Sequence, residues 1–114
     1  MEHSNQLIKW DDFAKIEIRV GTIIHAEIFP EARKPSYKLK IDFGPYGIKK
    51  TSAQLTKLYI PVELIGKQVV AVLNFPSKQI GHFHSECLIL GAMNHDEVTL
   101  LTTDMPTENG LLIG

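Results

Sequence analysis

Hydrophobic and polar residues alternate most clearly between Tyr37 and Phe43. The residues on one face of this stretch are apolar: Tyr37, Leu39, Ile41 and Phe43. The residues on the other face are charged: Lys38, Lys40 and Asp42. A period of two is typical of a half-buried β-strand. After a turn at Gly44–Gly47, a second strand is predicted over Ile48–Ser52. The pair predicts a core face and an opposite, basic face.

The stretch before this pair predicts a long first strand over Ile16–Phe29. Apolar residues alternate with charged ones up to Gly21, and the phase of the pattern then shifts. A glycine at such a shift predicts a bulge or sharp bend at Gly21. Two prolines within Pro30–Pro35 predict a loop there.

The stretch after the pair predicts one short helix and further strands. Apolar residues at helical spacing place the helix within Leu55–Ile65, with Pro61 in its first turn and Gly66 at its end. The other predicted segments are a strand over Lys67–Phe75 buried on both faces, a polar loop over Pro76–Ser85, strands over Cys87–Leu90 and Val98–Leu101, and a turn at Asn94–Glu97.

The order of these elements indicates the fold class. Three strands, a helix and two more strands are the order of the OB-fold. We therefore expect an all-β, five-stranded OB-fold barrel with a short helix between strands 3 and 4 and with strand and tail extensions. Residues 1–114 are expected to form one domain, with a core over about residues 13–109.

Composition narrows the class of protein. The chain has 114 residues, 44% of them hydrophobic and 22% charged, which is typical of a soluble globular domain. No apolar run approaches the roughly 20 residues that span a bilayer, and Met1–Trp10 lacks a signal-peptide pattern. A single cysteine permits no internal disulfide. A cytoplasmic location without membrane insertion is the expectation.

Charge is distributed unevenly along the chain. The net charge is −1, but the segment from residue 33 to 78 holds nine basic and two acidic residues, 9 − 2 = +7. This predicts a positive patch, which forms a single basic groove for an extended, anionic or polar ligand. The candidate charged and aromatic contacts are Arg33, Lys34, Tyr37, Lys38, Lys49, Lys50 and Lys78. The candidate polar floor is Ser52, Gln54, Asn74 and Ser85. A solvated strand face and ordinary capping of strand ends are the alternatives.

Metal binding and catalysis find little support in the sequence. His82, His84 and Cys87 lie close together, but zinc usually needs four ligands and no second cluster exists. His25 and His95 have no partner in the sequence. Catalytic and phosphate-binding motifs are missing, and Cys87 lies in an apolar run that predicts an inert thiol. We expect no enzyme activity, no metal and no cofactor.

Several segments resemble the tRNA-binding OB-fold domain family, and its CsaA chaperone-like branch in particular. Ile18–Gly21 reads IRVG, as at the start of these domains, and Lys67–Asn74 and Ser85–Leu90 resemble later strands. The other segments of resemblance are Phe29–Pro35, Tyr37–Leu39, Ile41–Gly44, Lys49–Lys50, Ser52–Gln54, Leu64–Val70 and Asn74–Pro76. Together they cover about residues 13–109.

This resemblance implies a homodimer without catalytic activity. It implies binding of unfolded or pre-secretory polypeptide in protein export, together with export machinery as a possible partner class. It also implies tRNA binding as the first alternative, and a structural dimer that scaffolds a partner is the second. The short tail and His82 and His84 depart from the family pattern.

Apolar residues at both ends of the chain predict the dimer interface. The expected interface residues are Trp10, Phe13, Ile16, Leu111, Leu112 and Ile113. One small barrel has difficulty covering both sets, and a two-fold dimer would bury them in a self-complementary patch. The alternative is that these ends pack on their own barrel.

Overall fold

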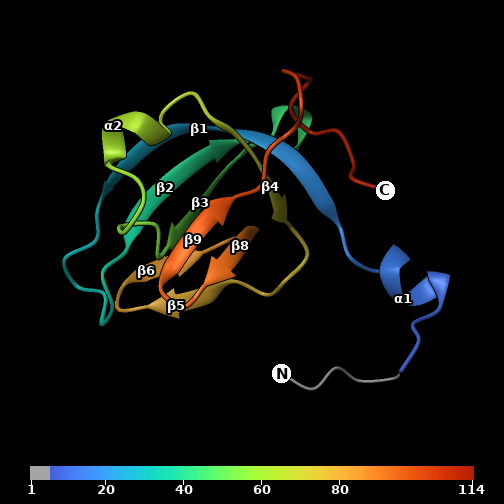
Figure 1. Cartoon of the computed structure of the whole chain (residues 1–114), viewed down its shortest axis with the longest axis horizontal. Helices are drawn as coiled ribbons and strands as arrows, with labels where there is room; N and C mark the ends of the chain where they lie inside the picture. The colour runs from blue at the N-terminus through green and yellow to red at the C-terminus, as the bar shows by residue number, and fades with distance from the viewer. Residues whose placement is uncertain (1–5) are drawn as a thin grey trace.

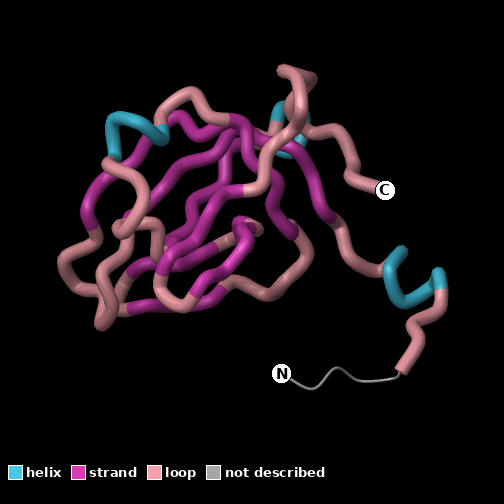
Figure 2. Tube along the Cα trace, in the orientation of Figure 1, coloured by secondary structure: helices cyan, strands magenta, loops and turns pink. Residues whose placement is uncertain are grey.

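The computed structural model describes residues 6–114, so residues 1–5 of the predicted domain lie outside the described part. Strands dominate, and helices are few and short (Figure 2). In chain order the elements are α1 (Trp10–Ala14), β1 (Ile18–Ile28), β2 (Tyr37–Asp42), the 3-10 turn η1 (Gly44–Tyr46), β3 (Ile48–Ala53), α2 (Pro61–Leu64), β4 (Gln68–Val72), β5 (Lys78–Ile80), β6 (Phe83–Ser85), β7 (Leu88–Ile89), β8 (Gly91–Asn94) and β9 (Glu97–Leu100) (Figure 1).

Five strands form a nearly closed antiparallel barrel, as the sequence predicts. Their order in the sheet is β3-β2-β1-β4-β7. The free edge of β3 meets the segment before β7, where the Glu86 amide donates to the Lys50 carbonyl at 2.8 Å. The Thr51 hydroxyl donates to the Cys87 carbonyl at 2.7 Å. These bonds close the barrel and leave few unpaired main-chain groups along β3.

The predicted core face is confirmed in β2 and β4. Leu39 and Ile41 of β2 are buried, and all residues from Val69 to Val72 in β4 are buried. Leu64 of α2 also reaches this core. The charged residues of β2 face outward, so the period of two correctly separated the two faces.

The predicted bulge at Gly21 is wrong in position. Residues Ile18–Thr22 pair with β4 without interruption, and the register with β2 shifts between Ile23 and His25. Gly21 has a packing role instead. A β-carbon there would stand 2.6 Å from Ile41 and 2.7 Å from Phe43 side-chain atoms, so a larger residue would displace the core.

The predicted helix is shorter than expected. Only Pro61–Leu64 is helical, with Pro61 at its start as predicted. Ile60 is extended, with φ −105° and ψ 156°. A residue that precedes proline avoids the helical region, so the helix does not extend back toward Leu55.

Two hairpins replace parts of the chain that the sequence left irregular. The predicted loop Pro76–Ser85 contains β5 and β6, joined by Gly81 at φ +62° and His82. The predicted turn after Asn94 is present, but it joins β8, which was not expected, to β9. Each strand has only three or four residues, which is too short for a clear alternation.

The two ends of the chain behave differently. The tail lies along β1, where the Gly110 amide donates to the Val20 carbonyl at 2.7 Å and the Ile113 amide to the Ile18 carbonyl at 2.8 Å. In contrast, α1 stands away from the barrel (Figure 1), and none of its residues is buried. Within residues 6–114, no helix has the length and apolar character needed to cross a membrane.

Candidate functional site

A groove of about 700 Å³ lies beside the end of β3. Two parts of the chain that are separated in sequence form most of it: the end of β3 and the segment from Phe75 through the β8–β9 hairpin. Its lining is mainly apolar and includes Phe75, Ile80, Leu88, Ile89, Met93 and Val98. Lys78 and Asp96 carry its opposite charges, so the groove as a whole is nearly neutral. Such a lining suits apolar side chains of a ligand.

Four of the predicted site residues line this groove: Ser52, Gln54, Lys78 and Ser85. Ser85 also holds the barrel together, because its hydroxyl oxygen accepts from the Ser52 amide at 2.9 Å and lies 2.9 Å from the Thr51 hydroxyl. In this structure Ser85 therefore caps main-chain groups of β3, which was the alternative to a role in ligand binding. Gln54 and Lys78 are exposed and remain available to a ligand.

The other predicted cations do not line the groove. Lys38 and Lys50 lie on the outer face of β2 and β3, together with Lys40, which pairs with Lys50. We call Lys38, Lys40 and Lys50 the lysine face. Arg33 and Lys34 are exposed in the loop between β1 and β2. The single basic groove expected from the sequence is thus divided into a neutral groove and a separate lysine face.

Lys49 and Lys50 point in opposite directions, although they are neighbours. Lys49 pairs with the buried Ile41, whereas Lys50 pairs with Lys40 on the outer face. Successive side chains of a strand always alternate in this way. Lys49 is therefore not part of the lysine face.

Aromatic rings lie beneath the lysine face. The Lys38 ammonium stands 5.1 Å from the ring centroid of Phe29, and the Lys50 ammonium stands 5.3 Å from that of Phe83. Lys38 also lies 4.0 Å from a carboxylate oxygen of Glu27. A hydrogen bond with His25 lowers the pKa of Glu27, and the charge of Lys38 acts in the same direction. The surface combines cations with a partly exposed ring.

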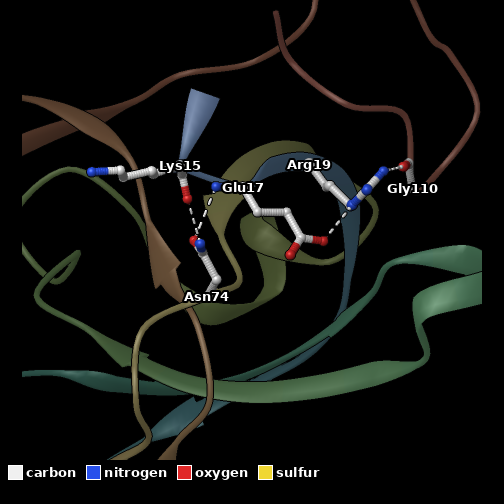
Figure 3. A network of polar contacts seen from close by, with 5 residues as sticks. All are labelled: Lys15, Glu17, Arg19, Asn74 and Gly110. Carbon is white, nitrogen blue, oxygen red and sulfur yellow. Dashed lines mark hydrogen bonds and ion pairs between the residues drawn. The ribbon is translucent and has the colours of Figure 1, made fainter. Parts of the chain in front are cut away.

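Tyr37 and Asn74 have structural roles. Tyr37 is buried, and its hydroxyl donates to the Tyr59 carbonyl at 2.8 Å, so it is a core residue rather than an exposed contact. The Asn74 side chain donates to the Lys15 carbonyl at 2.6 Å and accepts from the Glu17 amide at 2.9 Å (Figure 3). Asn74 therefore joins the end of β4 to the segment before β1, outside the groove.

Sequence reasoning missed the role of Arg19. Its guanidinium donates to Glu17 at 2.7 Å and to the Gly110 carbonyl at 2.8 Å (Figure 3). It also lies 3.9 Å from the ring centroid of Tyr46. Arg19 therefore links the start of β1 to the tail. Its place in the IRVG segment was the feature of the sequence that could have indicated this role.

A second apolar hollow, of about 470 Å³, lies near the base of α1. Its lining includes Ile16, Ile18, Val72, Phe75, Leu88 and Leu90. Among the predicted interface residues, Trp10 is 71% exposed and Leu112 is 58% exposed. The tail nonetheless pairs with β1 of the same chain, in agreement with the alternative that the chain ends pack on their own barrel. Apolar side chains at this end therefore remain uncovered in the single chain.

No arrangement suited to metal binding occurs among residues 6–114, where no three His, Cys, Asp or Glu side chains gather around a common point. His82 and His84 flank Phe83 in the β5–β6 hairpin. Cys87 is buried, and this burial raises the pKa of its thiol to about 12. A thiol with this pKa is protonated near neutral pH and is a poor nucleophile.

Comparisons with known proteins place the chain in a family. A family model described as a putative tRNA binding domain matches residues 18–111. The chaperone CsaA from Bacillus anthracis str. Ames has a solved structure with a TM-score of 0.92 and 46% identity, covering 96% of this chain and 100% of that one. The CsaA chaperone protein from Picrophilus torridus has a TM-score of 0.89 and 52% identity, covering 95% and 100%.

The chain is a CsaA-type member of the tRNA-binding domain family. The match over the whole length of both CsaA structures also confirms the predicted OB-fold barrel. The chain is also similar to part of several methionine–tRNA ligases. That of Pyrococcus abyssi is 36% identical over 109 residues, which are 96% of this chain and 15% of the enzyme. The chain thus spans about 15% of the length of this curated relative.

Proposed function

We propose that this protein is a non-catalytic chaperone that binds unfolded or pre-secretory polypeptide in the apolar groove. The observation that carries the proposal is a mainly apolar groove with opposite charges at Lys78 and Asp96. Such a surface accepts hydrophobic side chains and neither attracts nor repels polypeptides by net charge. The likeness to two structures described as CsaA chaperones supports the same class.

A two-fold dimer in the cytoplasm completes the proposal. Two copies would cover the exposed apolar residues around α1 and present two grooves to one long chain. A ligand that reaches both grooves gains avidity without any new contact. Export machinery is the proposed receiver of a pre-secretory polypeptide.

The experiment that tests the proposal is a titration with a permanently unfolded polypeptide, such as a reduced and carboxymethylated protein, followed by fluorescence anisotropy. We expect saturable binding by the parent protein and weak binding once the apolar lining carries a charge. Absence of saturable binding by the parent protein would refute the proposed function.

Binding of tRNA is the second candidate function, and the lysine face favours it. Lys38, Lys40 and Lys50 lie on adjacent strands, and the ring of Phe83 lies near the ammonium groups of Lys38 and Lys50. Clustered cations neutralise phosphates, and an aromatic ring offers a surface on which a base stacks. The family match to a putative tRNA binding domain supports this candidate.

Removal of the lysine face tests tRNA binding. We expect the triple alanine variant of Lys38, Lys40 and Lys50 to bind tRNA at least about tenfold more weakly, because contacts with phosphates are lost. Each lost phosphate contact should also reduce the slope of log affinity against log salt concentration by about 1. Affinity is measured by anisotropy between low and moderate salt. The matched control removes three exposed lysines elsewhere: Lys9, Lys57 and Lys67. Equal losses in both variants would contradict a role of the lysine face.

A further inference from the structure

The β8–β9 hairpin presents a free strand edge to the groove. β8 pairs with β9 and with no other strand among residues 6–114. Residues that face each other in an antiparallel pair alternate between hydrogen-bonded and non-hydrogen-bonded pairs. The register of this hairpin therefore determines which main-chain groups of β8 point away from β9.

Leu100 fixes the phase of that alternation. Its amide donates to the Tyr59 hydroxyl at 3.0 Å, away from β8. Its partner in register is Gly91, so Gly91 and Leu100 form a non-hydrogen-bonded pair. The next pair of this kind is Met93 with Val98. The main-chain groups of Gly91 and Met93 consequently point outward from the hairpin.

These same two residues of β8 line the groove, whereas Ala92 and Asn94 do not. Gly91 has no side chain because Val98 of β9 packs there: a β-carbon at Gly91 would stand 2.5 Å from a side-chain atom of Val98. Within residues 6–114, no main-chain hydrogen bond uses the outward groups of Gly91 or Met93. A donor and an acceptor are thus available at each of the two positions.

A second strand, β5, also lines the groove. Lys78 and Ile80 of β5 line the groove, and β5 pairs only with β6 among the described strands. An added strand lies about 4.8 Å from its neighbour and rises about 3.4 Å per residue. The four residues of β8 can therefore pair with about four residues of an extended chain, whose alternate side chains would contact the apolar lining.

We propose that the groove binds polypeptide as an added β-strand, paired through its main chain with Gly91 and Met93 of β8. This inference rests on the proposed function and specifies its substrate class: extended segments with free main-chain amides and apolar residues at alternate positions. Recognition through the backbone makes binding largely independent of sequence, which suits a chaperone for many clients.

Peptides with blocked amides test the pairing. The probe is a fluorescein-labelled octapeptide of alternating leucine and serine, compared with one form N-methylated on its leucines and one N-methylated on its serines. Only one set of amides faces β8 when the leucines contact the apolar lining. We expect one methylated form to bind at least about tenfold more weakly, and the other within about threefold of the unmodified peptide. Equal binding of all three peptides, or equal loss in both methylated forms, would overturn the inference.

A protein variant tests the same edge independently. Met93→Pro removes the outward amide of Met93 but keeps the bonds to β9, because proline is tolerated where the amide faces away from the sheet. We expect at least a tenfold loss for the unmodified octapeptide, with the circular dichroism spectrum unchanged. Parental affinity in a folded Met93→Pro protein would overturn the inference and leave the proposed function standing. Failure of both the octapeptide and a permanently unfolded polypeptide to bind the parent protein would overturn both.

Discussion

Phe75→Asp is expected to abolish most binding of unfolded polypeptide. Phe75 is 56% exposed, and its ring faces the groove at the side where the groove meets the hollow near α1, so it is available to a ligand as long as the dimer contacts stay on α1. Covering about 100 Å² of apolar surface contributes about 2.5 kcal/mol at about 25 cal/mol per Å². A carboxylate in its place removes this contribution and must itself lose water. The expected loss of affinity is at least about 50-fold.

The fold should tolerate this change, because surface substitutions usually alter stability by about 0.5 kcal/mol or less. The matched control is Val62→Asp, which places the same charge on an apolar residue that is 71% exposed on α2. The control should bind the unfolded polypeptide like the parent protein. Binding by Phe75→Asp within about threefold of the parent would contradict the placement of the ligand in the groove.

The double variant Trp10→Asp and Phe13→Asp is expected to convert a dimer into a monomer. Trp10 and Phe13 contact each other, with ring centroids 5.6 Å apart, yet no residue of α1 is buried. A helix of five residues is not stable without packing, because nucleation costs more than so few hydrogen bonds return. A second copy that covers the apolar side chains of α1 supplies this packing.

Light scattering at micromolar concentration measures the dimer directly. The parent protein should have twice the chain mass of 12.8 kDa, and the double variant should have the mass of one chain. Val62→Asp again serves as the control, since α2 and α1 lie at opposite ends of the molecule (Figure 1). A parent protein with a mass near 12.8 kDa would refute the dimer.

The sequence predicted the barrel well because its strands carry local patterns. The alternation in β2, the continuous apolar run in β4 and the proline at the start of α2 are each visible within a few residues. The bulge was misplaced because a glycine within a strand has two explanations. At Gly21 the deciding factor was the close approach of Phe43, which lies 22 residues further along the chain.

The candidate site was harder to predict because it depends on contacts between distant segments. Gln54, Phe75 and Met93 line one groove only after the two hairpins fold against the barrel. The sequence grouped the cations by their proximity in the chain and therefore combined the lysine face with the groove. The opposite directions of Lys49 and Lys50 were predictable from alternation alone. The burial of Tyr37 was predictable in the same way, because Tyr37 shares the apolar face of its strand with Leu39 and Ile41.

Mapping of the bound polypeptide by NMR is the most direct test of the central claim that the groove binds unfolded chains. The isotope-labelled protein is titrated with a permanently unfolded polypeptide, and changes in amide chemical shift are recorded for each residue. We expect the largest changes at residues that line the groove: Gln54, Phe75, Ile80, Leu88, Gly91 and Met93. Changes confined to the lysine face, with the amides of the groove unaffected at saturation, would contradict this claim.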